Sequence, residues 1–142
     1  MEESPLVSVI MPAYNSADFI AEAIQSVLHQ FHPNWELLII DDASEDNTVE
    51  IIKKFASADP RIQLFQNKTN QGTGVSRNIG IKAAQGSYIS FLDADDLWLP
   101  KKLETQLDFM KSHDLEMTYS SYYLIKESGQ ELQSLLRRLL GA

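Results

Sequence analysis

Short apolar runs alternate with amphipathic stretches along most of the chain. Four of these runs have the composition of buried or half-buried strands, and they cover residues 6–11, 35–40, 61–66 and 88–92. The amphipathic stretches predict helices over residues 17–30, 44–58 and 75–84, and from near Pro100 to near Ser112. A further run at residues 116–125 is rich in β-formers and predicts a fifth strand.

This alternation predicts an α/β fold with a Rossmann-like, doubly wound and mostly parallel sheet joined by right-handed crossovers. The third strand alternates between apolar and polar residues, which places it nearer an edge. Pro12 cannot donate to a strand ladder and is expected to end the first strand. Ser16 and Ser44 are expected to cap the two helices that follow them, and Gly86 to follow the end of the third helix.

The chain of 142 residues is long enough for one domain, which we expect to span residues 1–128. Residues 129–142 form a Leu-rich tail that predicts an amphipathic C-terminal helix, with apolar positions Leu132, Leu135, Leu136, Leu139 and Leu140. We interpret this tail as a cover for exposed sheet surface. The alternative is that it forms a homodimer or contacts a membrane surface peripherally.

The composition narrows the classes of partner. A net charge of −8 argues against binding to a nucleic acid, because phosphate backbones require a basic face. The absence of cysteine excludes disulfides and thiolate metal sites. No apolar run approaches the roughly 20 residues of a membrane span. We therefore expect a cytoplasmic protein, with association at the inner face of the membrane as an alternative.

Three carboxylates, Asp93, Asp95 and Asp96, follow the strand at residues 88–92. Carboxylates this close together raise each other's pKa unless a cation lies among them. Mg²⁺ and Mn²⁺ prefer oxygen ligands, and Mg²⁺ is commonly held by one or two carboxylates together with substrate phosphates. One interpretation is therefore a divalent metal beside a nucleoside diphosphate. The other is a solvated acidic turn at the end of a strand.

Two other strands also end in polar loops, at residues 12–16 and 41–44. In doubly wound folds ligands bind outside the carboxyl ends of the strands, so the three loops are expected to converge at one edge of the sheet. Tyr14 offers a flat face for a base, although it could equally be a packed aromatic residue. Asp41 and Asp42 offer acceptors for an imide N–H or for ribose hydroxyls, and we expect one of the two to cap a helix instead.

Arg77 follows the polar loop at residues 67–74, which contains two glycines. Its guanidinium group could pair with a phosphate or with the acidic cluster. Judged alone, it could equally be a solvated helix residue. The glycine loop is not a P-loop, because no Gly-Lys-Ser or Gly-Lys-Thr follows it.

Four motifs in this order resemble the family 2 glycosyltransferases of GT-A fold. They are VSVIMPAYN at residues 7–15, IIDDASEDNT at 39–48, NQG with SRNIG within 70–80, and FLDADD at 91–96. The resemblance covers about residues 5–128. It implies the inverting transfer of a sugar, usually from a UDP-sugar, to a glycan or lipid-linked acceptor in polysaccharide biosynthesis, with Mn²⁺ or Mg²⁺ as the metal.

The resemblance also implies a role for each matching residue. Pro12, Ala13 and Tyr14 would line the nucleoside pocket, Asp42 would meet the uracil, and Arg77 would lie near the base or the diphosphate.

On the acidic side, Asp93 and Asp95 would form the D-x-D element, which contacts the ribose and the metal. Asp96 is a further candidate for the metal or the donor sugar.

The catalytic base of this family is an acidic residue among the acceptor-binding elements, and no residue of this chain matches it. An inverting displacement needs such a base opposite the leaving group. We therefore expect the base outside this chain, which would be a truncated or naturally short donor-binding portion, weak or inactive alone. The alternative is a non-catalytic nucleotide-sugar-binding or interaction module. A phosphatase that uses an acidic D-x-D fits less well, because its acidic pair would follow the first strand.

Overall fold

The computed structural model describes residues 4–125 of the chain. The chain divides into two compact units, Met1–Thr105 and Gln106–Ala142. The first unit contains all four strands and the first three helices. The Leu-rich tail, with its predicted helix, lies outside the described residues.

Four strands form one parallel sheet in the order β3-β2-β1-β4. They are β1 (Val7–Ala13), β2 (Trp35–Asp41), β3 (Ile62–Gln66) and β4 (Tyr88–Phe91). Every residue of β1 and β2 is buried, as continuous apolar runs in the middle of a parallel sheet require. The predicted α/β class and parallel, doubly wound sheet are therefore confirmed, and β3 lies at an edge as expected.

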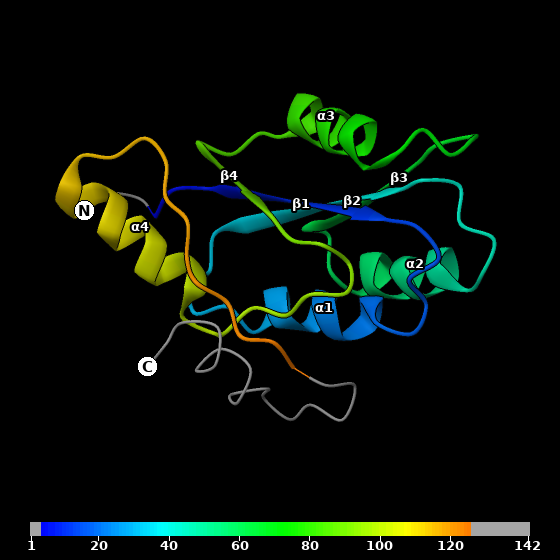
Figure 1. Ribbon diagram of the computed structural model, residues 1–142, viewed down its shortest axis with the longest axis horizontal. Helices are drawn as coiled ribbons and strands as arrows, with labels where there is room; N and C mark the ends of the chain where they lie inside the picture. Colours follow the sequence, from blue (N-terminus) through cyan, green and yellow to red (C-terminus); the bar gives the residue numbers. More distant parts are fainter. Residues whose placement is uncertain (1–3, 126–142) are drawn as a thin grey trace, which may run out of the picture. The chain divides into compact units, whose positions relative to one another are not determined.

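Helices cover both faces of the sheet. In Figure 1, α1 (Ile20–Leu28) and α2 (Thr48–Ala58) lie on one face, and α3 (Thr73–Ala83) lies on the other. The helix α4 (Lys102–His113) follows β4 in the chain. Within residues 4–125, no helix has the length and apolar character needed to cross a bilayer.

Pro12 does not end the first strand, so that prediction is wrong. The strand β1 continues to Ala13 and pairs with β2 over its whole length. Along β1, the backbone N–H and C=O groups of successive residues point in turn toward β4 and toward β2. The carbonyl of Ile10 accepts from Leu92 N on the β4 side. The carbonyl of Ala13 accepts from Asp42 N on the β2 side. Pro12 therefore faces the β4 side, where pairing has already ended at Ile10. Its missing N–H costs no ladder bond.

The two predicted serine caps are also wrong. The helices α1 and α2 begin four residues after Ser16 and Ser44, and neither helix has a side-chain cap. The Ser16 hydroxyl donates to the carbonyl of Tyr14, and the Ser44 hydroxyl accepts from the backbone N–H of Asn15. Both serines therefore order the loops that precede the helices.

Two glycines bring backbone close to β1. A Cβ on Gly80 of α3 would lie 2.5 Å from Ile10 Cγ2, so the glycine lets α3 approach the sheet. Gly86 does not adopt the left-handed conformation expected of a residue that ends a helix. Instead its N–H donates to Ser8 Oγ at 2.8 Å, and a Cβ there would lie 2.6 Å from the carbonyl oxygen of Leu6.

The fifth strand predicted at residues 116–125 is absent from the described part of the chain, where only Ile125 takes part in an isolated bridge. Most of its side chains are exposed, including Met117 at 81% and Tyr119 at 92%. Strand preference reflects packing against a neighbouring strand more than an intrinsic tendency of the backbone, and this segment has no such neighbour among the described residues.

The segment after β4 is fastened to the end of α1. The side chain of Gln30 donates to the carbonyl of Leu99 at 2.8 Å and accepts from the backbone N–H of Leu103 at 3.1 Å. The backbone N–H of Phe31 donates to the carbonyl of Pro100. The acidic cluster therefore lies on a segment that is held at both ends, by the sheet and by α1.

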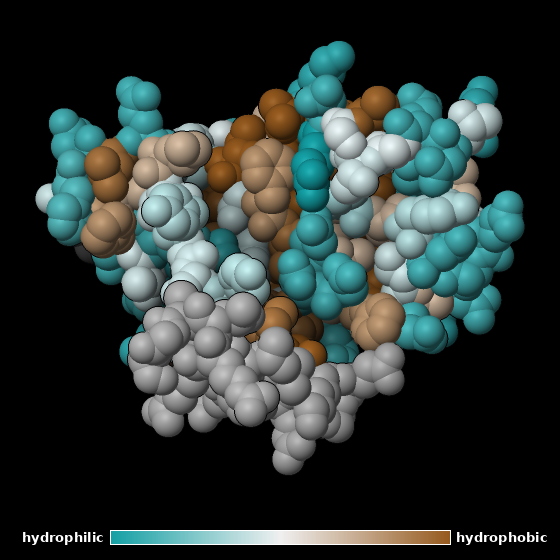
Figure 2. Space-filling model, viewed as in Figure 1, coloured by the Kyte–Doolittle hydropathy of each residue, from teal (hydrophilic) through white to brown (hydrophobic). Residues whose placement is uncertain are grey.

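On the face of the sheet that α3 covers, β4 carries exposed apolar side chains. Figure 2 shows apolar side chains at the surface where α3 and β4 lie. The exposed apolar residues of these elements include Ile81, Ile89 and Phe91, each more than 40% exposed. Among the described residues of the first unit, α3 packs mainly on β1 and β2.

Two glycine substitutions are expected to change stability in opposite directions. Gly86→Ala should lower the free energy of unfolding by about 2 kcal/mol, because its Cβ would meet backbone atoms of β1 that cannot move aside. Gly74→Ala should raise it by about 0.5 kcal/mol, because this helical position has no atom within 4 Å of the added carbon. Urea unfolding of both variants measures the difference, and equal effects would contradict this account of Gly86.

Candidate functional site

A cavity of about 420 Å³ opens at the carboxyl edge of the sheet. It lies where the strand order reverses around β1, which is the usual ligand site of such folds. The lining residues come from the end of β1, the loops after all four strands and the start of α3. They are Pro12, Ala13, Tyr14, Asn15, Ser16, Phe19, Asp42, Asn70, Gly72, Thr73, Ser76, Asp93, Ala94 and Asp95. The three polar loops identified in the sequence therefore share one cavity.

Asp42 organises the β2 side of the cavity. Its Oδ1 accepts from Asn67 Nδ2 at 2.7 Å and from the backbone N–H of Gln71 at 2.9 Å, and its Oδ2 accepts from the backbone N–H of Gly72 at 2.8 Å. Gly72 has a φ of 88°, a left-handed conformation that glycine adopts without strain. One buried carboxylate thus holds the loop that leads into α3.

These bonds also set the charge of Asp42. Burial acts to raise its pKa, but the hydrogen bonds from Asn67, Gln71 and Gly72 outweigh burial and hold the pKa below its ordinary value. The carboxylate is therefore ionised at neutral pH. A carboxylate has about four acceptor positions, of which three are used here, so one remains for a ligand.

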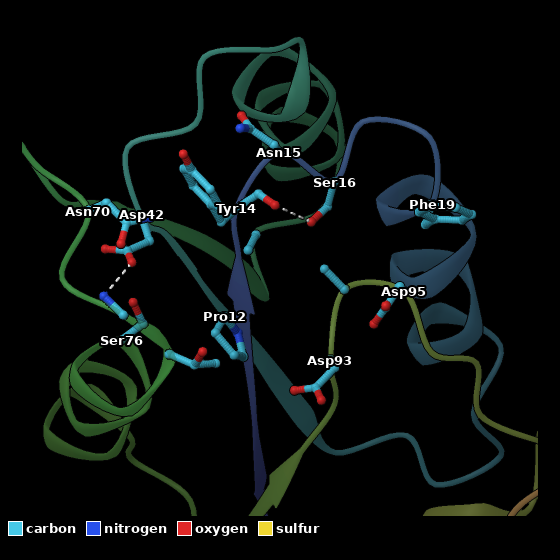
Figure 3. Close-up of a pocket in the computed structure, with 14 residues that line it drawn as sticks. Pro12, Tyr14, Asn15, Ser16, Phe19, Asp42, Asn70, Ser76, Asp93 and Asp95 are labelled. Atoms are coloured by element: carbon cyan, nitrogen blue, oxygen red, sulfur yellow. Dashed lines mark hydrogen bonds between the residues drawn. The ribbon is translucent and has the colours of Figure 1, made fainter.

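Tyr14 lies in the cavity and not in the core. Its side chain is 50% exposed, whereas the preceding Pro12 and Ala13 are buried as part of β1. Figure 3 shows Tyr14 and Asp42 on one side of Pro12, with Asp93 and Asp95 on the other. Tyr14 is therefore not a core residue, and its role in stacking on a base remains a prediction.

Asp93 and Asp95 line the opposite side of the cavity, whereas Asp96 does not. Arg77 also lies outside the lining, but its Nη2 forms an ion pair with Asp93 Oδ1 at 2.8 Å. Burial, and then the negative charges of Asp95 and Asp93, raise the pKa of Asp96. Negative charge is therefore concentrated at this end of the cavity, and the Arg77 guanidinium group lies beside Asp93.

A metal at this cluster would need ligands from a substrate. Within residues 4–125, no three Asp, Glu, His or Cys side chains come close enough together to hold a metal ion. Asp93 and Asp95 nonetheless fit the arrangement usual for Mg²⁺, in which one or two carboxylates act with phosphate oxygens. The prediction that Asp93, Asp95 and Asp96 bind a metal remains a prediction.

Asp41 and Asp42 have different surroundings. Asp41 is 1% exposed and does not line the cavity. Its Oδ2 accepts from the backbone N–H of Ser44 at 3.2 Å. It therefore orders the turn after β2. The expectation that one of the two aspartates caps the next helix is wrong, because α2 has no side-chain cap. Of the two, Asp42 is the candidate for contact with a ligand.

Several lining residues were not identified from the sequence. Phe19, which falls within the helix predicted over residues 17–30, is 44% exposed and lines the cavity, because α1 begins after it. Ser76 and Thr73 line the cavity from the first turns of α3, and Ser76 is fully buried. Their position after the glycine loop was the available signal, since a helix N-terminus at a strand edge faces the ligand site.

The chain is similar in sequence to proteins that are named glycosyltransferases. Over 123 residues, 87% of this chain and 48% of the relative, the sequence is 42% identical to the Escherichia coli UDP-Glc:alpha-D-GlcNAc-diphosphoundecaprenol beta-1,3-glucosyltransferase WfgD. Another relative, an uncharacterized glycosyltransferase of Haemophilus influenzae, is 44% identical over 91% of this chain and 52% of its own length. The chain spans about half the length of these curated relatives.

Solved structures share the fold. The S. aureus protein TarS in complex with UDP-GlcNAc matches with a TM-score of 0.72 and 29% identity over 85% of this chain and 38% of that one. The mannosyltransferase PcManGT from Pyrobaculum calidifontis, in complex with GDP-Man and Mn²⁺, matches with a TM-score of 0.70 and 28% identity over 75% and 32%. The GT-A type of nucleotide-binding sheet is therefore confirmed.

Residues 8–139 match the family described as Glycosyl transferase family 2. The match begins in β1 and continues past residue 128, where we expected the resemblance to end. It thus includes every cavity-lining residue. This chain belongs to family 2 of the glycosyl transferases.

Proposed function

We propose that the chain is the donor-binding portion of an inverting, metal-dependent glycosyltransferase that uses a UDP-sugar. One observation supports this proposal above the others. A single cavity has an exposed aromatic ring and a buried carboxylate on one side and an acidic pair on the other. These are the groups that a base and a metal-bound diphosphate require.

At the base end, Tyr14 supplies a face for stacking and Asp42 supplies the remaining acceptor position for an imide N–H. Asp42 is held in place before a ligand arrives, because three hydrogen bonds fix its carboxylate. A uracil carries one such N–H between two carbonyl groups. A UDP-sugar also agrees with the TarS structure, which contains UDP-GlcNAc, and with WfgD, which is named for UDP-Glc.

At the phosphate end, Asp95 and Asp93 would hold Mn²⁺ or Mg²⁺ together with diphosphate oxygens, and Asp96 would lie beside them. The cation would neutralise the charge that develops on the leaving diphosphate. Arg77 keeps Asp93 in place through its ion pair and lies close enough to the diphosphate end to add positive charge. The Mn²⁺ in the PcManGT complex agrees with this assignment.

We also propose that the catalytic base and the acceptor contacts come from outside these 142 residues, so the chain binds donor better than it transfers sugar. The acceptor would be a glycan or a lipid-linked sugar, the second of which WfgD is named for. A non-catalytic binding module has the same cavity and differs only in turnover. A UDP-release assay on UDP-glucose and UDP-N-acetylglucosamine distinguishes the two. The phosphatase alternative is set aside, because the chain belongs to a glycosyl transferase family.

Metal-dependent binding of UDP tests the phosphate end. We expect isothermal titration to show UDP binding that strengthens when Mn²⁺ is added. Asp95→Asn should weaken the Mn²⁺-dependent binding by about tenfold, because hydrogen bonds to charged groups are worth roughly 1.5–3 kcal/mol. Glu22→Gln, which removes an exposed charge from α1, is the matched control and should bind as the unaltered chain does. Full Mn²⁺-dependent affinity in Asp95→Asn would place the metal elsewhere.

Substitution of Tyr14 tests the base end. Tyr14→Leu should raise the Kd for UDP by about tenfold, because loss of base stacking costs roughly 1–3 kcal/mol. Tyr14→Phe keeps the ring and should stay within about twofold of the unaltered chain by the same argument. Equal Kd values for the leucine and phenylalanine variants would show that the ring does not stack on the base.

A further inference from the structure

Hydrogen bonds join the loop after β1 to the loop after β2. We name this contact the loop clasp, and it consists of Asn15, Ser16 and Ala17 on the first loop and Ser44, Glu45, Asp46 and Thr48 on the second. The partners lie 29 to 32 residues apart in the sequence. The clasp begins one residue after Tyr14, and any role for it in ligand binding rests on the proposed nucleotide site.

The first part of the clasp is a reciprocal pair of bonds made by Asn15. Its backbone N–H donates to Ser44 Oγ at 2.9 Å, and its side-chain Oδ1 accepts from the backbone N–H of Glu45 at 2.9 Å. Asn15 has a φ of 45°, a left-handed conformation that asparagine tolerates better than most residues. The chain therefore changes direction at Asn15, directly after Tyr14. The bonds from Asn15 to the loop after β2 stabilise this turn.

The second part centres on Asp46 and Thr48. The backbone N–H of Ser16 donates to Thr48 Oγ1 at 2.8 Å, and that of Ala17 donates to Asp46 Oδ2 at 3.1 Å. Asp46 Oδ1 in turn accepts from the backbone N–H and the hydroxyl of Thr48, which fixes the threonine oxygen toward Ser16. Thr48 is fully buried, so water cannot readily replace its hydroxyl.

Tyr14 is thus fixed from both sides along the chain. Before it, the carbonyl of Ala13 accepts from the backbone N–H of Asp42 at 2.8 Å. After it, Asn15 and Ser16 are bonded to the loop after β2. Neither Thr48 nor Asp46 lines the cavity, so any effect of these two residues on a ligand passes through the loop that carries Tyr14.

We propose that Thr48 and Asp46 are positioning residues for nucleotide binding, which act through the backbone of Ser16 and Ala17 to hold Tyr14 against the base. Both oxygens of Asp46 must accept hydrogen bonds for this role. Burial acts to raise the pKa of Asp46, but its bonds from Thr48 and Ala17 outweigh burial and keep the carboxyl group ionised at neutral pH.

A pair of variants at Thr48 tests the proposal. Thr48→Val keeps the shape of the side chain and removes the oxygen, whereas Thr48→Ser keeps the oxygen. In titrations with UDP and Mn²⁺, we expect Thr48→Val to raise the Kd about fivefold and Thr48→Ser to stay within about twofold of the unaltered chain. Ser57→Ala removes an exposed hydroxyl elsewhere on α2 and is the matched control.

A double variant separates positioning from general destabilisation. If Thr48 acts by holding Tyr14, Thr48→Val should cost little further affinity in a chain that already carries Tyr14→Leu, because contacts that act through one group are not additive. Amide hydrogen exchange of Ser16, measured without ligand, should be faster with valine than with serine at position 48. The same loss of affinity in both backgrounds would overturn the proposal.

A second variant covers the case in which Thr48→Val does not fold. Asp46 is exposed, and Asp46→Asn replaces one acceptor oxygen by a donor, which cannot accept from Ala17. We expect this variant to weaken UDP binding by a few fold, and Glu50→Gln, which removes an exposed charge from the first turn of α2 outside the loop clasp, to leave it unchanged. UDP binding at full strength in both Asp46→Asn and Thr48→Val would overturn the proposal. A failure of the nucleotide site itself differs from this, because the unaltered chain would then bind no UDP.

Discussion

Seven consecutive parallel pairs join β1 to β2, from Val7 with Trp35 to Ala13 with Asp41. Both strands are buried along their whole length, so burial of apolar surface holds them together in the middle of the sheet. The register decides which residues stand next to one another where the strands end. Tyr14 and Asp42 line one cavity because each directly follows the last residue pair of β1 and β2, Ala13 with Asp41.

Beyond the sheet, the site is ordered mainly by polar groups that satisfy one another. Asp42 holds the glycine loop, Arg77 holds Asp93, and the loops after β1 and β2 hold each other. Each bond alone is worth only about 1 kcal/mol, but a cavity whose walls are already ordered loses less conformational entropy when a ligand binds. These groups are ordered in the absence of a ligand, so the proposed nucleotide site would depend in part on residues that do not line the cavity.

The sequence allowed the layout of the fold to be predicted because the strands have a continuous apolar pattern and the helices a periodic one. It also placed Tyr14, Asp42, Asp93 and Asp95 at one edge, since parallel strands end on the same side. The predictions were wrong where the structure of a residue depends on contacts with segments that are distant in the sequence. Phe19 could not be recognised as a cavity residue without the start of α1.

The two serines and Gly86 illustrate the same limit of local patterns. Ser16 and Ser44 have the composition of helix caps, yet the nearness of the two loops gives their hydroxyls other partners. Gly86 follows a helix, yet its position is set by contact with the backbone of β1. Residues 116–125 have strand-forming side chains but no strand to pair with among the described residues.

Pro12 has a further consequence for how the chain finds its native pairing. A slide of β4 along β1 by two residues would keep every side chain on its present face, so hydrophobic burial alone does not oppose it. Such a slide would bring a carbonyl of β4 opposite Pro12, which has no N–H to donate. The proline therefore disfavours this shifted pairing, because one ladder bond would be lost. Pairing between β4 and β1 ends at Ile10, and the segment that carries Asp93 and Asp95 leaves the sheet beyond that point and reaches the cavity.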